Sequence, residues 1–257
     1  TFFYQDILNP EMGAGQVAAE ASASRKHGYT AFKLKVGRPG RWFAPQAGLE
    51  RDVEVVTAVR EAVGPDARIM VDANFGYDGR LDLREDFIRE TLPANLYWME
   101  EMVTADLGDY RVLRRTRDRL GSNALLVCGE VDTDPPSPVF VDLVKAGLID
   151  GFQPDCTATG FSRWQALEEW LEPTGVRSVP RNFGNGTFGT RAELVFGAAS
   201  QTFLMLEDER FRPAVFADDD VSFSDGHYST PSGHGLGLTV DTHRFQREYS
   251  ANEIVIR

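Results

Sequence analysis

Three carboxylates stand at equivalent places in the sequence, each at the end of a short apolar run. Asp72 follows IMV, Glu100 follows YWM and Glu130 follows LLVCG, at intervals of 28 and 30 residues. If these runs are neighbouring parallel strands, the acids meet at one end of the sheet and repel each other unless a cation neutralises them. Oxygen ligands alone favour Mg²⁺ over Zn²⁺. The alternative is that each acid caps the helix that follows it.

Two lysines occupy alternate positions of the segment FKLKVG. Lys33 and Lys35 fall on one face of the expected strand, and Phe32, Leu34 and Val36 fall on the other. The apolar face suits a layer of helices, so both ammonium groups are expected to point into the interior of a barrel. Buried lysines need carboxylate partners or a function. The alternative is an edge strand whose lysines are solvated.

The elements that would position these groups alternate regularly between strand and helix patterns. We expect strands near Phe2–Asp6, Phe32–Val36, Ile69–Ala73, Tyr97–Met102, Leu125–Gly129, Gly151–Pro154, Arg177–Arg181 and Phe203–Leu206. We expect helices near Gly15–His27, Leu49–Val63, Asp82–Leu92, Gly108–Leu120, Ser137–Ala146, Gly160–Leu171 and Gly189–Ala199. Eight even units favour a closed (β/α)₈ TIM-type barrel of the α/β class over an open doubly wound sheet.

The barrel is predicted to span residues 1–208 as the catalytic domain. Residues 209–257 break the rhythm, beginning with an acidic run, Asp218 to Asp220, and are predicted to form a C-terminal extension that packs on the barrel. No GxGxxG follows the first strand, which argues against a dinucleotide fold.

Composition narrows the classes of partner. The 257 residues include 27 Lys and Arg against 39 Asp and Glu, a formal net charge of −12. This balance argues against nucleic acid or an anionic membrane as the partner. No apolar run reaches the length of a transmembrane helix, and no signal peptide is visible. With two cysteines, Cys128 and Cys156, a disulfide framework is not expected, and a cytoplasmic location is.

Further polar residues end the later strands. QPD places Asp155 after the sixth, VPRN places Arg181 after the seventh, and LED places Glu207 after the eighth. In barrels of this type the carboxyl ends of the strands form the active site. Polar groups at so many successive strand ends are hard to explain as core packing.

Six motifs in order resemble the enolase superfamily, in its mandelate racemase/muconate lactonizing branch. They are KLKVG (33–37), VDAN (71–74), WMEEM (98–102), GE (129–130), QPD (153–155) and LED (206–208). The resemblance implies that Asp72, Glu100 and Glu130 bind Mg²⁺, and that the enzyme removes the proton α to a carboxylate and holds the enediolate on the metal. It further implies that Lys35 is the general base and that Lys33 contacts the substrate carboxylate and favours the neutral form of Lys35. Glu207 is expected to hydrogen-bond the same carboxylate.

Two features depart from the family pattern. In the racemase-like subgroup, a His on strand 7 pairs with the Asp at the position of Asp155, and here Arg181 or Asn182 stands in its place. Arginine is a poor proton shuttle, so an Asp155–Arg181 ion pair is expected. Arg181 could instead bind a distal carboxylate or the hydroxyls of the substrate. The lysine that the muconate lactonizing subgroup has just after Asp155 is absent too. His27, His227, His234 and His243 are expected to be surface residues. We expect the family's N-terminal capping domain to lie outside the 257 residues of this sequence.

A Mg²⁺-dependent acid-sugar dehydratase follows as the first hypothesis, because one base suffices for elimination. The alternatives are a racemase, epimerase or cycloisomerase of the same superfamily, a Schiff base on Lys35 as in class I aldolases, and a barrel that only binds an acid. The expected partner is a small-molecule carboxylate, an acid sugar, and the family commonly forms homo-oligomers.

Overall fold

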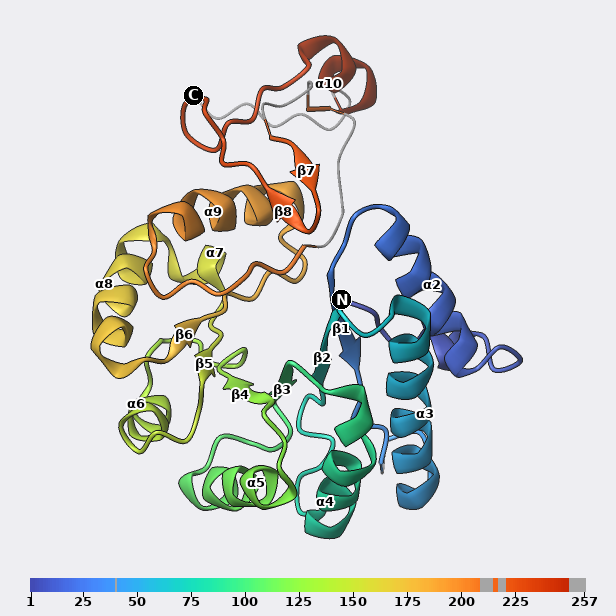
Figure 1. Cartoon of the computed structure of the whole chain (residues 1–257). Coiled ribbons are helices and arrows are strands. Elements are labelled where there is room, and N and C mark those ends of the chain that lie inside the picture. Colours follow the sequence, from blue (N-terminus) through green and yellow to red (C-terminus); the bar gives the residue numbers. More distant parts are fainter. Residues whose placement is uncertain (40, 209–214, 217–220, 250–257) are drawn as a thin grey trace.

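A six-stranded parallel sheet forms the centre of the molecule in the computed structural model, which describes residues 1–39, 41–208, 215–216 and 221–249. The strands pair in chain order: β1 (Ala31–Lys35), β2 (Arg68–Asp72), β3 (Trp98–Glu100), β4 (Leu125–Cys128), β5 (Gly151–Phe152) and β6 (Arg177–Ser178). Figure 1 shows these strands as an inner arc with the helices outside it. All carboxyl ends therefore face one rim, as the expected barrel requires.

Helices follow the strands where the sequence predicts them. The helices are α2 (Ala14–Lys26), α3 (Pro45–Val63), α4 (Leu81–Glu90), α5 (Leu107–Leu120), α6 (Pro138–Lys145), the short α7 (Cys156–Thr159), α8 (Phe161–Leu171) and α9 (Gly186–Ala199), with short 3₁₀ turns η1 (Leu92–Ala94) and η2 (Glu172–Thr174). The start signals are local: a proline opens α3, and the side chain of Asp106 accepts hydrogen bonds from the backbone at the start of α5.

The first and last expected strands are much shorter than predicted. Instead of a strand over Phe2–Asp6, only Phe2 bridges to Leu34, and helix α1 (Gln5–Leu8) begins at once. Instead of a strand over Phe203–Leu206, only Phe203 bridges to Ser178. Both bridges are parallel, so each segment still stands where the barrel needs its first and eighth staves. A short ladder at the eighth stave is expected, because Pro180, two residues after Ser178, has no N–H to donate.

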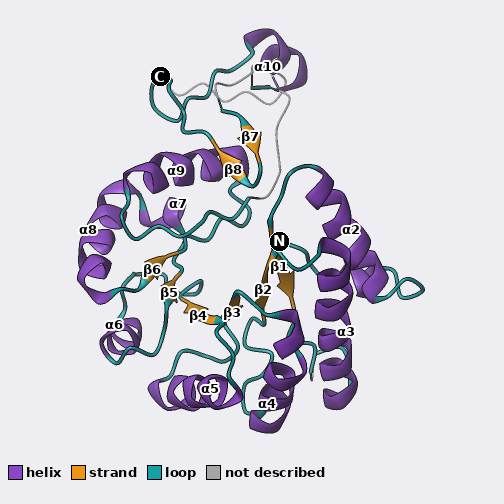
Figure 2. Ribbon diagram, in the orientation of Figure 1, coloured by secondary structure: helices purple, strands orange, loops and turns teal. Residues whose placement is uncertain are grey.

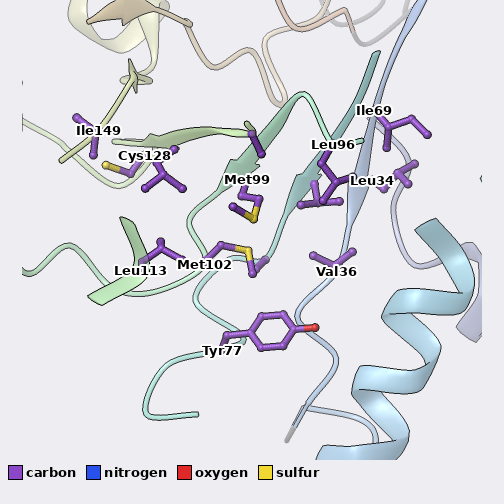
Figure 3. Close-up of a cluster of buried hydrophobic side chains, with 14 of the residues drawn as sticks. Leu34, Val36, Ile69, Tyr77, Leu96, Met99, Met102, Leu113, Cys128 and Ile149 are labelled. Atoms are coloured by element: carbon purple, nitrogen blue, oxygen red, sulfur yellow. The ribbon is translucent and has the colours of Figure 1, made fainter. Parts of the chain in front are cut away.

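The hydrophobic core lies between the strands and the helices. Figure 3 shows Leu34, Ile69, Met99 and Cys128 from successive strands turned toward this layer. The opposite faces of the same strands bury a small apolar group inside the barrel, made of Met70, Trp98, Val127 and Val179. Beyond this group, the inward positions become charged toward the carboxyl ends. The apolar faces therefore fix the orientation of the strands, and the charged residues point inward as a result.

The tail is described in part. Strands β7 (Phe223–Ser224) and β8 (His227–Tyr228) form a hairpin, and α10 (Thr242–Tyr249) follows (Figure 2). The Phe223 ring packs on Tyr29, with centroids 4.6 Å apart. The acidic run 218–220 lies outside the described residues, so the division at residue 208 stays a prediction. Within the described ranges, no helix is long and apolar enough to cross a membrane.

Candidate functional site

Strand β1 delivers both lysines to the interior of the barrel, as its alternation predicts. Lys33 and Lys35 are buried. The Lys33 Nζ lies 2.9 Å from Glu100 Oε1 and 3.2 Å from Glu207 Oε1. The Lys35 Nζ contacts the Asp72 carboxylate and donates to Asn74 Oδ1 over 2.7 Å. β1 ends the described six-stranded sheet, with only Phe2 bridging to its outer side. The alternative of solvated lysines is nevertheless wrong, because both side chains are buried and contact buried carboxylates.

The three predicted acids converge. The register pairs Lys35 with Asp72 across β1 and β2, and Asp72 with Glu100 across β2 and β3. Lys35, Asp72 and Glu100 therefore stand at one level of the sheet. Asp72, Glu100 and Glu130 each offer one carboxylate oxygen within 4.8 Å of the others. Asp72 and Glu100 are fully buried. We call these three residues the acid cluster.

Close backbone contact behind the strands holds the two neighbouring loops together. Gly37 has φ +83°, and a Cβ there would lie 2.2 Å from the Ala73 carbonyl oxygen. A Cβ on Gly76 would lie 2.2 Å from the Gly37 carbonyl oxygen. Asn74, next to Ala73, adopts a left-handed φ of +39°, which is uncommon for a residue with a side chain. This packing sets the loop that carries Asn74 against the loop that follows Lys35.

Burial and mutual repulsion dominate the electrostatics of the acid cluster. Burial, together with the charge of Asp72, raises the pKa of Glu100 well above its usual range. Burial beside Glu130 raises the pKa of the neighbouring Glu101 to about 7. Burial disfavours the charged form of Lys33, but the attraction of Glu100 and Glu207 outweighs it and holds the pKa of this lysine well above the ordinary value. The protein thus concentrates more acid here than its own cations offset.

The opposite wall of the site is built around Arg181. Its Nε lies 2.7 Å from Glu130 Oε1, and its Nη1 lies 3.2 Å from Asp155 Oδ2, which is the expected ion pair. Asp155 also accepts from the backbone of Thr157 and Ala158 at the start of α7. Asp155 therefore caps the start of α7, which is the role considered as the alternative for the three cluster acids. Burial opposes ionisation of Asp155, but these hydrogen bonds and that of Thr157 Oγ1 lower its pKa.

Glu207 completes the site from the eighth stave. Burial disfavours its ionised form, but the charge of Lys33 lowers its pKa to about 2. Its backbone N–H donates to Glu193 Oε2 over 3.2 Å, and its side chain accepts from the Asn182 N–H. Glu207 is therefore an ionised carboxylate held beside a charged lysine.

A pocket of about 270 Å³ reaches both lysines, Glu130, Arg181 and Glu207. Its lining residues are Phe3, Tyr4, Lys33, Lys35, Asn74, Glu130, Arg181, Phe183 and Glu207. A larger cavity of about 550 Å³ runs along the gap between the first and eighth staves and reaches Lys33 and Glu207 as well. The smaller pocket is the better candidate for chemistry, because both lysines, Glu130 and Arg181 face it. The four histidines are all exposed and lie outside its lining.

Three site residues were not assigned a role from the sequence. Asn74 lies between Lys35 and Glu130, with its Nδ2 3.4 Å from Glu130 Oε2. Glu101 has a left-handed φ of +43° and accepts from the Glu130 N–H. Glu193 is fully buried and holds the backbone of Glu207. Asn74 and Glu101 belong to motifs quoted above, so their place at a strand end was the available signal; Glu193, within α9, gave none.

Comparison with known proteins decides the family. The family model described as "Enolase C-terminal domain-like" matches residues 16–244. The chain belongs to this family. Its solved structural neighbours fall in the mandelate racemase/muconate lactonizing branch of the enolase superfamily. One is a mandelate racemase/muconate lactonizing protein from Geobacillus sp. complexed with magnesium and tartrate, 29% identical with a TM-score of 0.84, covering 92% of this chain and 60% of that one.

Other members of the family differ in reaction. A galacturonate dehydratase from Geobacillus sp. is 28% identical with a TM-score of 0.85, covering 96% of this chain and 65% of that one. D-galactarolactone cycloisomerase from Agrobacterium fabrum is 31% identical, over 87% of this chain and 58% of the relative. L-talarate/galactarate dehydratase from Salmonella typhimurium is 27% identical, over 88% and 51%. The chain thus spans less than two thirds of the length of these relatives.

Proposed function

We propose that this chain is the catalytic barrel of a Mg²⁺-dependent lyase that removes the α-proton of a sugar acid and eliminates the β-hydroxyl. The convergence of Asp72, Glu100 and Glu130 beside Lys35, in a member of this family, is the observation that carries the proposal. The relatives named above include two dehydratases of acid sugars, which supports this reaction class.

The acid cluster fits a hard divalent cation. It offers carboxylate oxygens alone, within 4.8 Å of one another, and burial together with the charge of Asp72 raises the pKa of Glu100. Asp72, Glu100 and Glu130 would hold the ion. When bound, Mg²⁺ supplies positive charge that favours the negative charge developing on a substrate carboxylate. A non-catalytic acid-binding barrel would have no need for a lysine in contact with this cluster.

The two lysines divide the remaining work. Lys33 stays charged between Glu100 and Glu207, so it is suited to pair with the substrate carboxylate rather than to accept a proton. Lys35, in its neutral form, accepts the α-proton at Nζ. Asn74 holds that nitrogen at 2.7 Å and so positions it. Lys33 and Lys35 occupy alternate positions of β1 and so share one face of the strand. The base and the anion-binding group therefore act on the same side of the pocket.

Elimination balances with a single base. The α-C–H bond breaks, its proton passes to Lys35, and its electron pair forms the enediolate. The enediolate then expels the β-hydroxyl, which leaves as water with the proton that Lys35 returns. The resulting enol tautomerises to a 2-keto-3-deoxy acid. Racemisation of a substrate in one pose needs a second base on the other face. The Arg181 guanidinium, paired with Glu130 and Asp155, has no acceptor site for a proton.

A cycloisomerase is the second candidate, because the relative from Agrobacterium fabrum that carries this activity is 31% identical over 87% of the chain. The two reactions separate by mass. Dehydration yields a product lighter by one water, whereas isomerisation conserves mass.

The experiment is a screen of mono- and diacid sugars with Mg²⁺, read by mass spectrometry and by assay of 2-keto acids. The proposal expects a 2-keto-3-deoxy product from at least one acid, abolished by EDTA and restored by added Mg²⁺. Product formation that survives chelation, or borohydride trapping of substrate on Lys35, would instead support a Schiff-base mechanism. Mg²⁺ binding without turnover of any acid would favour a binding protein.

A further inference from the structure

Arg181 is held in one orientation by two carboxylates from different staves. Its Nε pairs with Glu130 and its Nη1 with Asp155, and its guanidinium lies 5.5 Å from the centre of the Phe183 ring. No described residue accepts a hydrogen bond from the third nitrogen, Nη2. The side chain is 23% exposed and lines the 270 Å³ pocket. Arg181 therefore lines the pocket with one guanidinium nitrogen still able to donate a hydrogen bond.

The positive charge of the Arg181 guanidinium is already more than offset by two carboxylates. Glu130 and Asp155 both contact Arg181, and Asp155 is kept ionised by hydrogen bonds from Thr157, Ala158 and Asn185. An arginine that shares its charge between two acids has little attraction left for another carboxylate. A neutral hydroxyl oxygen, in contrast, accepts a hydrogen bond without adding charge.

The summed charge of the pocket and the residues around it also disfavours a second carboxylate. The pocket is lined by three cations, Lys33, Lys35 and Arg181, and by two acids, Glu130 and Glu207. Three further acids contact those cations without lining the pocket: Glu100, Asp72 and Asp155. If all eight groups are counted as ionised, a divalent cation offsets their net charge. The neutral Lys35 that the proposed base requires and the reacting carboxylate of the substrate then both make the total negative. A second carboxylate would then enter a pocket that carries its own sign, which costs binding free energy.

The lining near Arg181 is apolar. The rings of Phe3 and Phe183 are 38% and 51% exposed, with their centroids 5.4 Å apart. These faces can pack against the C–H groups of a polyol, whereas they offer no hydrogen bond to a hydrated anion.

We propose that the substrate is a sugar acid with a single carboxylate, and that Arg181 Nη2 donates a hydrogen bond to a hydroxyl of its uncharged tail. This inference rests on the proposed function and narrows its substrate class. Asp155 acts here as a positioning and charge-setting residue, because it touches Arg181 rather than the substrate.

The test compares matched acids on the full chain with Mg²⁺. Gluconate and glucarate, or galactonate and galactarate, share chain length and differ only in whether C6 is an alcohol or a carboxylate. We measure α-proton exchange in D₂O by NMR, and binding by calorimetry. Within the pair that reacts, we expect kcat/KM for the monoacid to exceed that for the diacid by about tenfold or more, the factor that 1.4 kcal/mol supplies.

Two variants separate charge from structure. Asp155→Asn removes one negative charge beside Arg181 and should bring the monoacid-to-diacid ratio toward unity. Asp134→Asn, at an exposed ion pair with Arg163, is the matched control and should leave the ratio unchanged. Arg181→Gln should raise KM for both acids by roughly tenfold, as expected for one lost charged hydrogen bond, and should keep the preference for the monoacid.

The outcomes distinguish this inference from the function on which it rests. If the diacid is used as well as or better than the monoacid, and Arg181→Gln abolishes that use selectively, Arg181 binds a distal carboxylate and the inference is wrong while the function stands. If no acid of any pair binds or exchanges with Mg²⁺ present, the proposed function itself is wrong.

Discussion

Two groups of buried charge lie on either side of the turn that follows β1, and they are built on different principles. One is the acid cluster with Lys33 and Lys35. The other, which we call the Arg38 cluster, consists of Asp6, Arg38, Asp52 and Tyr77. Arg38 is fully buried, pairs with Asp6 at 2.5 Å and with Asp52 at 2.6 Å, and donates to the Lys35 carbonyl at 3.1 Å.

The Arg38 cluster satisfies its members within the protein. Asp52 Oδ2 alone accepts from the Gly37 N–H, the Arg38 N–H and the Tyr77 hydroxyl. Burial raises the pKa of Asp52 too, but Arg38 and Tyr77 act against that rise. In the acid cluster, burial and the charge of Asp72 both raise the pKa of Glu100, well above its usual range. Next to the cluster, Glu101 has a buried oxygen, Oε2, without a partner among the described residues. Buried charge that is fully hydrogen-bonded stabilises a turn, whereas buried charge left in surplus indicates a site for something else.

The largest expected effect concerns the Arg38 cluster. Arg38→Met leaves Asp6 and Asp52 buried without their main partner, so we expect the free energy of unfolding to fall by about 3–5 kcal/mol. Arg89→Met is the matched control, because Arg89 pairs with Glu85 and Asp86 on the exposed face of α4 and should change stability by less than about 1 kcal/mol. Urea denaturation followed by circular dichroism measures both. Equal losses would contradict the structural role assigned to this cluster.

The next effect concerns the acid cluster, where loss of a charge should act on rate rather than on folding. Lys35→Ala removes the proposed base, so α-proton exchange of a reacting sugar acid should fall by about 10³-fold, or about 4 kcal/mol of activation free energy. NMR in D₂O measures the exchange, and the exposed Lys145 on α6 provides the control, Lys145→Ala. Exchange that persists in Lys35→Ala would show that another group is the base.

This contrast also explains what the sequence could and could not predict. The acid cluster was predictable because Asp72, Glu100 and Glu130 stand at the ends of strand patterns, 28 and 30 residues apart. Lys33 and Lys35 were predictable because they share one face of a single strand pattern. Parallel strands place such residues at one rim, whatever the details of packing. The role of Asn74, which joins these residues, could not be predicted. Asn74 reaches Lys35 and Glu130 from a left-handed backbone conformation, which no periodicity in the sequence indicates.

The Arg38 cluster and the two outer staves show the other limit. Asp6 and Asp52 lie 46 residues apart in sequence and meet only through tertiary contact. The segment from Phe2 has the β-rich pattern of a strand, but it pairs at one residue and then turns into α1, because local hydrogen bonds compete with the ladder. The helices were predictable within a few residues, since their apolar stripes are long enough to define a period.

A smaller effect tests whether the acid surplus is real. The pKa of Glu101 is raised to about 7, so this carboxyl ionises less readily in the folded protein than in the unfolded one. The folded protein therefore loses stability as the pH rises from about 4.5 through 7. In EDTA, Glu101→Gln should match the wild type near pH 4 and exceed its unfolding free energy by about 3 kcal/mol near pH 8. Denaturation at several pH values measures the difference. The exposed Glu61→Gln should show no such trend; a flat difference for Glu101→Gln would contradict the raised pKa.

The smallest effect joins the two clusters in one measurement. A ligand that binds only the folded state at a hundred times its Kd stabilises it by about 2.7 kcal/mol, so Mg²⁺ should raise the unfolding free energy of the wild type by about that amount. Glu100→Gln removes a proposed ligand and should lose most of this increment. Asp52→Asn weakens the Arg38 cluster, and should lower stability with and without Mg²⁺ while keeping the increment, because its hydrogen bonds lie outside the acid cluster. An increment that disappears in Asp52→Asn and survives in Glu100→Gln would reverse the roles assigned to the two clusters.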